Sequence, residues 1–586
     1  MIRWFYVLFL VLFSFKLMHV PSSTDQAVGR LPVLYEGRVM PLDSLARQQL
    51  LQIQGRLKLN SYSPVQWYFS HLTIPNFGGD LNTVLVEHPF LFDTLNPAFK
   101  KQKYRLNANF LTQNIDLILP LIQAADSLEK EQRSPIQQAA FMVASRFSMQ
   151  QLISTQFFPF YEQSQLAYWN KMLLLSQSFD PNNIELSPSF NEFIALYNSL
   201  LDGQSNLYFI FDKTWKTLPE AALSPSQTYK RLLSDYLLLA DSFQTNSLIK
   251  LQQYSSSIMS QFKSFSPYTY FKVNLEFIFN AINPFIVSLF LYVLIVLLVF
   301  FSRFFGLKNG QQFIKDTWVM ALLFHTFGLI ARIIILGRPP VINLYSSAIF
   351  IAYVVSVIGY IMYKKRGYLF FAGYPSVLAL LSLIVAYHLS LSGNTMDVMQ
   401  AVLNSNFWLS THVVSMTIGY AIILMAGFFA ISYILMGSLT RILTPDFEDR
   451  LGKLVYVFLM ISLFFNFLGT VLGGIWADQS WGRFWGWDPK ENGAIMIVLW
   501  TAIILHLKWG RLLTNRWLMI LTVFSNVVTA WSWKGTNMLG IGLHSYGFTE
   551  KTFYWLMIFF VTQISIMILG MLPLKYWLSF QNEKNR

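Results

Sequence analysis

Long apolar segments dominate the second half of the chain, and short polar segments separate them. Each is near the length, roughly 20 residues, that a helix needs to cross a bilayer. The nine segments are residues 278–302, 317–337, 341–363, 369–391, 408–438, 454–475, 493–508, 516–532 and 552–577. The pattern predicts an all-α polytopic membrane protein with about nine transmembrane helices in residues 278–577 and a short tail at 578–586.

The residues before this bundle form two parts with different patterns. Residues 4–20 are apolar and follow Arg3, so residues 1–23 are either a signal peptide or an N-terminal membrane anchor. Residues 24–277 are mainly polar, and apolar positions recur there at helical spacing, which favours a mostly helical domain. The clearest helical segments are residues 107–125, 136–154 and 226–253.

The charges indicate how the bundle is oriented. The chain has 43 Lys and Arg against 30 Asp and Glu, a formal net charge of +13. Residues 21–277 are balanced, 20 against 20, so the excess belongs to the bundle and does not indicate a nucleic-acid partner. The connections after the first, third, fifth and seventh apolar segments hold most of the cations, which predicts that they face the cytoplasm. The large domain and the other connections then face outward.

A tryptophan-rich segment connects the sixth and seventh apolar segments. Residues 481–491 read Trp-Gly-Arg-Phe-Trp-Gly-Trp-Asp-Pro-Lys-Glu, so Trp481, Trp485 and Trp487 are interleaved with glycines such as Gly482. Scattered tryptophans are typical of the aromatic belt at a membrane surface, which is the alternative interpretation. Interleaved glycines and nearby cations favour a flat apolar platform for haem instead. We therefore predict a haem site on this segment.

The polar residues of the segment have two possible uses. Arg483 and Lys490 are candidates for pairing with haem propionates. Asp488 and Glu491 either accept hydrogen bonds from a ligating imidazole or cap the helix that begins near Pro489. We favour the cap for both carboxylates.

Two histidines flank this segment in similar positions. His412 lies at the outer start of an apolar segment, and His544 lies in a glycine-rich connection on the same predicted side. Each is compatible with an ordinary interfacial histidine. As a pair beside an aromatic platform, they predict bis-imidazole ligation of haem iron at an outer site.

Two further histidines lie inside predicted membrane segments. His506 is about one turn from the cytoplasmic end of its segment, where an ionisable residue is a functional candidate. It either ligates a second haem or donates to a backbone carbonyl. His325 is the natural partner within the chain for an inner site. The remaining histidines are interpreted as structural or interfacial, with His19 a ligand only if the first segment is retained: His19, His71, His88 and His388.

Cysteine is absent from the chain. This excludes disulfides, iron–sulfur clusters and thiolate metal sites, and it excludes covalent attachment of haem to this chain through a Cys-x-x-Cys-His motif. The expected cofactor is therefore non-covalent haem b, which is also the expected cargo.

The residues quoted above resemble the CcsA family, also called ResC, of the system II pathway of cytochrome c maturation. The tryptophan-rich segment is similar to the family's WWD segment, His412 and His544 fall where its outer ligands lie, and His506 matches its membrane histidine. The segments from Gly337 to Tyr345 and from Thr395 to Leu409 also resemble the family. The likeness covers about residues 315–577. The segment from Leu31 to Asp43 resembles the outer domain of extended members.

The resemblance implies a membrane component of a holocytochrome c synthase, or haem lyase. Such a protein moves haem to the outer WWD site and presents it to the Cys-x-x-Cys-His motif of apocytochrome c for thioether attachment. The implied partners are a CcsB- or ResB-like membrane subunit, apocytochrome c, membrane lipid and, indirectly, proteins that keep thiols reduced. The implied location is the inner membrane of a bacterial-type cell. The second ligand of the inner haem is then either His325 or a residue of the partner subunit.

Two other functions are open from the residues alone. A b-type electron-transfer cytochrome would also hold haem between two histidines, although such proteins usually place both ligands inside the bundle. A haem exporter that hands its cargo to a chaperone, as the related CcmC family does, would share the outer site without forming thioether bonds.

Overall fold

The computed structural model describes the chain in two compact units. The N-terminal unit comprises His19–Ile282 and Leu391–Val398, and the membrane unit comprises Met1–Met18, Asn283–Ser390 and Met399–Arg586. The described residues are 2–157, 207–539 and 550–580, apart from gaps at 58, 60–61, 75–76, 78–82, 96–103, 129–131, 212–213, 223, 225, 308, 392 and 397–403.

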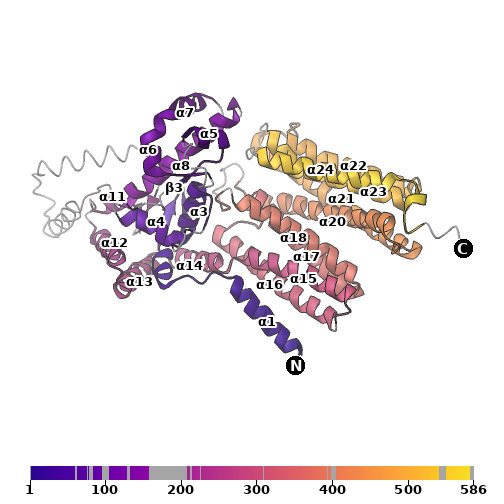
Figure 1. Cartoon of the computed structure of the whole chain (residues 1–586), viewed down its shortest axis with the longest axis horizontal. Helices are drawn as coiled ribbons and strands as arrows, with labels where there is room; N and C mark the ends of the chain where they lie inside the picture. Colours follow the sequence, from indigo (N-terminus) through magenta and orange to yellow (C-terminus); the bar gives the residue numbers. More distant parts are fainter. Residues whose placement is uncertain are drawn as a thin grey trace, which may run out of the picture. The chain divides into compact units, whose positions relative to one another are not determined.

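The N-terminal unit is mainly helical, as the apolar spacing predicts. Side chains such as Trp67, Tyr68 and Phe69 are fully buried in its core. Its helices are α2 (Ser23–Gly29), α3 (Leu42–Gln54), α4 (Pro64–Thr73), α5 (Pro89–Leu95), α6 (Ala108–Asn114), α7 (Leu119–Asp126), α8 (Pro135–Phe157), α11 (Leu218–Ala222), α12 (Gln227–Gln244), α13 (Leu248–Phe265) and α14 (Pro267–Ile282). Figure 1 shows how they are arranged.

The three predicted helical segments of this unit have different outcomes. The segment 136–154 is one helix, α8. The segment 107–125 is divided into α6, a 3₁₀ turn at Ile115–Leu117 and α7, because Pro120 in the first turn of α7 cannot continue a preceding helix. The segment 226–253 is divided into α12 and α13 by a turn in which Asn246 has a φ of 53°.

Three small sheets accompany these helices, and the helical spacing did not predict them. β1 and β2 form an antiparallel hairpin, with Val33 opposite Met40, and β5 extends it in the order β2-β1-β5. Glu36 and Gly37 join the two strands with φ values of 48° and 76°, the signs that a two-residue type I′ turn requires. The strands are β1 (Pro32–Tyr35), β2 (Arg38–Pro41), β3 (Thr83–Leu85), β4 (Arg105–Asn107), β5 (Leu207–Tyr208), β6 (Ile210–Phe211) and β7 (Trp215–Lys216).

A buried polar network fastens this hairpin to helices α3 and α14. Arg38 pairs with Glu276 at 2.5 Å, and the same carboxylate accepts a hydrogen bond from the Ser44 hydroxyl at 2.6 Å. Asn280 donates to both Ser44 and Asp43, at 2.8 and 2.9 Å. Because buried charges are tolerated only when paired and hydrogen-bonded, these groups fix the register of the hairpin on α14.

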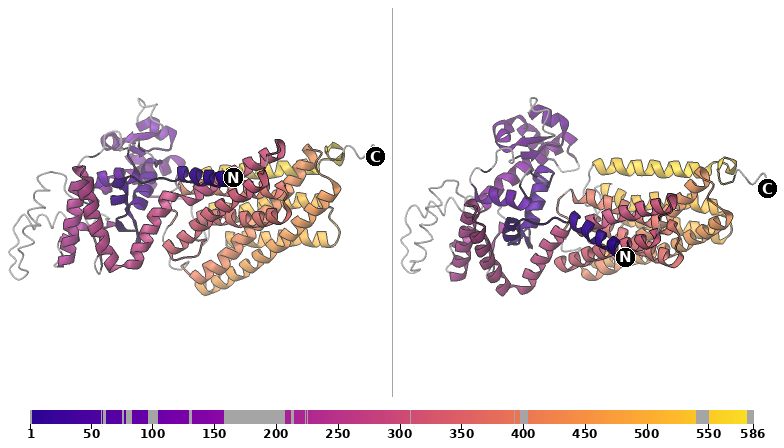
Figure 2. Two further views of the ribbon diagram at one scale, coloured as in Figure 1. Left: turned by 90° about the horizontal axis from the view of Figure 1, so that it is seen from below. Right: turned by 60° about the horizontal axis from the view of Figure 1, so that its bottom comes forward.

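The membrane unit is a bundle of long apolar helices that run alongside one another (Figures 1 and 2). Helix α20 is at its centre and contacts α17, α18, α21, α23 and α24. Its long elements are α1 (Ile2–Leu17), α15 (Pro284–Phe304), α16 (Gly310–Leu336), α17 (Leu344–Arg366), α18 (Leu369–Ser390), α20 (Val414–Leu439), α21 (Pro445–Trp481), α22 (Pro489–Trp509), α23 (Asn515–Ala530) and α24 (Glu550–Met571).

Short helical turns extend several of these helices. α19 (Asn406–Trp408) and the π-helical turn η5 (Leu409–Val413) lead into α20. The π-helical turn η6 (Trp531–Gly535) and the 3₁₀ turn η7 (Thr536–Leu539) follow α23. A 3₁₀ turn, η8 (Leu574–Tyr576), follows α24.

The predicted membrane segments match these helices closely. Eight helices in the described residues are long and apolar enough to cross a membrane, so the chain is a multi-pass membrane protein. The remaining predicted segment, 516–532, the eighth along the chain, corresponds to α23, whose α-helical part has only 16 residues and continues directly into η6. The last predicted segment ends early, at Met571, because Pro573 follows.

The boundary between the two units lies slightly later than predicted. The first predicted membrane segment begins at residue 278, but α14 extends to Ile282 and belongs to the N-terminal unit. Asn283, with a φ of 49°, separates α14 from α15, although the two helices together form one long apolar stretch, Pro267–Phe304. The connection Leu391–Val398 also belongs to the N-terminal unit, where Met396 lies 3.4 Å from the Arg38 guanidinium.

Candidate functional site

The tryptophan-rich segment forms a short loop that is fixed at both ends. Helix α21 ends at Trp481, and Gly482 then takes a φ of 69° and donates its backbone N–H to Asp478 O at 2.8 Å. This left-handed position favours glycine, which explains the first glycine of the motif. Helix α22 begins at Pro489, so the connection between the two helices has only seven residues, 482–488.

Asp488 and Glu491 form a capping box at the start of α22. The Asp488 carboxylate accepts a hydrogen bond from the Lys490 backbone at 2.8 Å. The Glu491 carboxylate accepts from the backbone N–H groups of Asp488 and Gly486, at 3.1 and 2.8 Å. The predicted capping role is therefore confirmed, and Glu491 additionally holds the loop backbone in place.

The aromatic side chains of the loop differ in exposure, and Trp485 is only partly exposed. Trp487 is 71% exposed, although its φ of 56° is unusual for a residue other than glycine. The rings of Trp485 and Trp487 meet edge to face with centroids 6.1 Å apart. Phe484 folds back onto α21 at Gly474. A β-carbon at Gly474 would lie 2.6 Å from the Phe484 ring, so glycine leaves the room that this ring needs. The loop thus presents a tryptophan pair at the end of the bundle.

Arg483 lies over the loop in this structure. Its guanidinium lies directly against Gly486, where a β-carbon would collide with Nη1. The same Nη1 is 3.7 Å from Glu491 Oε1. Among the described residues neither of these two atoms has a hydrogen-bond partner, although both are buried. The distance is too long for a hydrogen bond, so the pair is loosely held.

Lys490, the second predicted cation, bonds to the protein backbone. Its Nζ donates to Trp533 O at 2.7 Å and to Ser532 O at 3.0 Å, both in η6. A π-helical turn leaves some of its carbonyls without the usual i→i+4 partner, so they can accept from a side chain. Lys490 therefore ties the start of α22 to the end of α23, and Gly493 allows their close approach because its β-carbon would lie 2.9 Å from Ser532 Cα.

Lys534 is a further cation of this region and was not among the predicted site residues. It follows Trp533 in η6, and no described residue bonds to its ammonium. Burial lowers the pKa of Lys534 below the ordinary value for lysine. A partly buried ammonium without a partner is a candidate for pairing with an anion. The preceding residue, Trp533, accepts a hydrogen bond from Lys490 at the start of α22. The backbone at Lys534 is therefore close to the end of the tryptophan-rich loop.

His412 is held in a defined orientation at the same end of the bundle. It lies in the π-helical turn η5, and its Nδ1 is 2.7 Å from Gly469 O of α21. Its ring meets that of Trp476 at 5.8 Å and 62°. Gly473 provides the space, since a β-carbon there would lie 2.6 Å from His412 Cε1. Donation from Nδ1 to a carbonyl leaves the lone pair on Nε2, the tautomer that suits a metal ligand.

An apolar cluster connects His412 to the loop and to the Gly337–Tyr345 segment. Ile342, Trp408, Leu409 and Trp476 are buried together, with Trp481 packed against them. Trp408 also donates its indole N–H to Gln479 at 3.0 Å. The Gly337–Tyr345 segment, the start of the helix that carries His412 and the end of α21 are thus brought together. His544 lies outside the described residues.

The two membrane histidines have opposite surroundings. His325 is fully buried, with its ring nitrogens 3.2 Å from Tyr292 Oη and 3.1 Å from Ile349 O. His506 is exposed on the outside of the bundle, with Nδ1 2.7 Å from Ala502 O. His325 thus faces α15 and α17, and the described structure does not bring it together with His506.

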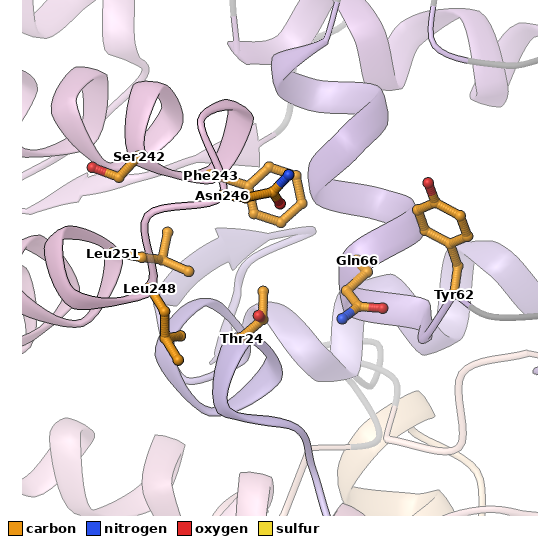
Figure 3. Close-up of a pocket in the computed structure, with 8 residues that line it drawn as sticks. All are labelled: Thr24, Tyr62, Gln66, Ser242, Phe243, Asn246, Leu248 and Leu251. Carbon is orange, nitrogen blue, oxygen red and sulfur yellow. The ribbon is translucent and has the colours of Figure 1, made fainter.

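A half-open pocket of about 260 Å³ lies in the described part of the N-terminal unit. Figure 3 shows its lining, where Tyr62 and Gln66 face side chains of α12 and α13 such as Phe243. No titratable carboxylate, lysine or histidine lines this pocket. His71 is buried and bonds to Trp67 O at 2.9 Å, so its predicted structural role is confirmed.

The fold and this loop define a multi-pass membrane protein with an aromatic site at one end of its bundle. Residues 341–544 match the family model described as cytochrome C assembly protein. The CcsA cytochrome c biogenesis protein of Chlorella vulgaris is 30% identical over 282 residues, which cover 42% of this chain and 89% of that protein. The chain belongs to the CcsA family of cytochrome c biogenesis proteins.

Two further relatives show how far the likeness extends. CcsA of Prochlorococcus marinus is 25% identical over 303 residues, 46% of this chain and 95% of that protein. Protein NrfI of Wolinella succinogenes is 25% identical over 524 residues, so the likeness includes most of the N-terminal unit and covers 87% of this chain. The chain spans about half of NrfI, 53% of its length. Family membership supports a role in cytochrome c maturation, together with other components of that process.

Proposed function

We propose that this chain is the haem-handling component of a cytochrome c synthase. It would hold haem b at the tryptophan-rich loop and present it to the Cys-x-x-Cys-His motif of apocytochrome c. The observation that carries the proposal is the fixed His412 imidazole, bonded through Nδ1 to Gly469 O and packed on Trp476. This orientation suits an iron ligand at the end of the bundle that carries the tryptophan-rich loop, where Trp487 is exposed.

The second axial ligand of this outer site is proposed to be His544. It belongs to the connection between η7 and α24, outside the described residues, and the membrane topology from the charge distribution assigns it to the same side as His412. Two neutral imidazoles can hold the iron, and the histidine of the substrate motif can later replace one of them. That exchange would release the product without any acid–base step by this chain.

The charged residues of the site have separate proposed roles. Lys490 fixes the loop, because its hydrogen bonds go to Ser532 O and Trp533 O. Lys534 is proposed to pair with a propionate, because its ammonium has no partner among the described residues. Arg483 is the second candidate, since its pairing with Glu491 is long enough to be exchanged for a carboxylate of the haem.

The contribution of the chain to the reaction is proposed to be positioning. Each thioether forms when a cysteine thiol adds across a haem vinyl group, so that sulfur bonds to one vinyl carbon and the proton goes to the other. No net oxidation or reduction is needed. The tryptophan-rich loop would orient the ring edge toward the incoming thiols, and holding two reactants in place accelerates their combination.

An inner site is proposed to use His506 and a ligand from another subunit. The imidazole of His506 is exposed on the outside of the bundle, whereas both ring nitrogens of His325 are engaged within it. A CcsB-like membrane subunit docked at α22 would supply the second ligand. We accordingly propose the inner membrane of a bacterial-type cell, with the N-terminal unit and the outer site on the extracytoplasmic side.

The test is haem content and transfer in purified full-length variants. We expect His412→Ala and His544→Ala to lose the outer haem, with partial recovery in added imidazole, and His388→Ala to serve as a matched control. Transfer of haem from the wild-type protein, with its partner subunit, to a Cys-x-x-Cys-His peptide distinguishes the proposal from its rivals. Reversible redox cycling without transfer would indicate an electron carrier, and release of haem without thioether formation would indicate an exporter.

A further inference from the structure

The N-terminal helix α1 makes specific polar contacts with α16. Arg3 donates two hydrogen bonds to the Asp316 carboxylate, from Nε at 3.0 Å and from Nη2 at 2.9 Å. One turn later, the Tyr6 hydroxyl is 2.6 Å from the Thr317 hydroxyl. The Tyr6 ring also stacks on Phe313, with centroids 4.3 Å apart. A bidentate pair of this kind fixes both distance and orientation.

These contacts lie on one face of α1, which continues along the helix. Leu10 and Ser14 are only 1% and 2% exposed, and together with Arg3 and Tyr6 they follow the spacing of three to four residues that one helix face has. Helix α1 contacts α15 as well as α16. The inner face of α1 therefore packs on its neighbours through Tyr6, Leu10 and Ser14, and Arg3, whose side chain is 64% exposed, pairs with Asp316 at the edge of this surface.

The opposite face of α1 is entirely apolar and exposed. Its large side chains are between 48% and 79% exposed: Trp4, Phe5, Leu8, Phe9, Leu12 and Phe15. This distribution is the reverse of a helix on the surface of a water-soluble protein, where apolar groups face inward. It suits a helix with lipid on one side and a polar contact with its neighbour on the other.

We infer that α1 is retained as an additional membrane-spanning helix that packs on α15 and α16 through the Arg3–Asp316 pair. A signal peptide needs only a charged start, an apolar stretch and a cleavage site, and none of these requires a matching acid in a later helix. Asp316 is 11% exposed with α1 in place, and removal of α1 would take away both hydrogen bonds from Arg3 while that from Gln312 remained. The retained helix also fixes the N-terminus on the same side as the first turns of α16.

The length of α1 adds a condition to this inference. Its 16 residues span about 24 Å at 1.5 Å per residue, which is less than the roughly 30 Å of a typical hydrocarbon core. Lys16 in its last turn can extend toward the headgroups and compensate for the difference.

The first test uses the absence of cysteine in the chain. In the full-length protein in native membranes, Tyr6→Cys with Thr317→Cys should form a cross-link with a short bifunctional thiol reagent, detected by mass spectrometry of the linked peptides. The matched control is Phe5→Cys with Thr317→Cys, because Phe5 is 66% exposed on the other face. Equal cross-linking in both pairs, or none in the first, would overturn the packing.

The second test measures retention and the ion pair directly. The intact mass of the protein purified from membranes should include residues 1–20, and a mature chain that begins after them would refute the inference. Arg3→Asp and Asp316→Arg should each lower the thermal unfolding temperature in detergent, and the double variant should recover most of the loss. Two losses that simply add would show that the residues do not interact.

Discussion

Lys490 Nζ lies 2.7 Å from the backbone oxygen of Trp533, which connects the start of α22 to the π-helical turn at the end of α23. A second bond from the same ammonium reaches Ser532 O at 3.0 Å. The lysine of the motif thus has an internal partner, whereas the ammonium of Lys534, next to Trp533 in sequence, has none among the described residues and is the one proposed to bind a propionate. We therefore expect substitutions of Lys490 and of Lys534 to have different effects.

Replacement of Lys490 by Met should destabilise the protein. Two charge-assisted hydrogen bonds would be lost, although Ser532 O and Trp533 O would keep their bonds from Thr536 and Asn537, so we expect a loss of roughly 2–4 kcal/mol. Thermal unfolding in detergent measures the effect. Lys534→Met is the matched control, and its unfolding temperature should stay close to that of the wild type while its haem content falls. Equal destabilisation by both substitutions would contradict the division of roles.

Gly473→Ala should displace His412 without removing a ligand. The new β-carbon would lie 2.6 Å from His412 Cε1, so the ring must move and its bond to Gly469 O is strained. We expect haem retention to fall by roughly 10-fold or more, the usual effect of disturbing a group that orients a ligand.

The control for this substitution is Gly373→Ala, on α18. Its β-carbon would meet only Val299, at 3.4 Å, which is an ordinary contact. Absorption spectroscopy in the Soret region and pyridine haemochrome analysis measure both variants. A Gly473→Ala protein with wild-type spectra and haem content would show that the orientation of His412 does not matter.

Haem affinity should depend on pH through Lys534. Burial lowers the pKa of its ammonium in the ligand-free protein, and pairing with a propionate would raise it again. Between these two values haem binding takes up a proton, so affinity should fall as the pH rises, and the fall should begin below the ordinary pKa of lysine. An arginine stays charged over this pH range, so Lys534→Arg should remove the part of the pH dependence of haem affinity that comes from Lys534. Haem titrations between neutral and alkaline pH would test it, and an unchanged slope in Lys534→Arg would refute the assignment.

The sequence predicts most of the bundle because long apolar segments leave little choice. Each predicted span contains one long helix, and the deviations at the ends have local causes such as Pro573 and the turn at Asn283. The Asp488 cap also follows from local sequence, since an acid before proline and a glutamate three residues later is a known helix start.

The site was less predictable, because its contacts depend on irregular backbone. The role of Lys490 requires the π-helical turn Trp531–Gly535, which no spacing of apolar residues reveals. Likewise, the carbonyl that orients His412 belongs to α21, more than 50 residues away along the chain. Residue types identify candidates for a site, but only the packing of α20, α21 and α23 determines which of them are already engaged.

His325 and His506 should respond to substitution in opposite ways. His325→Ala removes a buried imidazole that contacts Tyr292 Oη and Ile349 O, so it leaves a cavity and takes away both polar contacts and should cost roughly 2–4 kcal/mol of stability. His506→Ala changes an exposed side chain and should alter stability by about 0.5 kcal/mol or less, yet reduce the haem bound by the complex with its partner subunit. Thermal unfolding of the isolated chain and haem content of the complex separate the two effects. Loss of haem in a His325→Gln variant that keeps wild-type stability would instead make His325 the inner ligand.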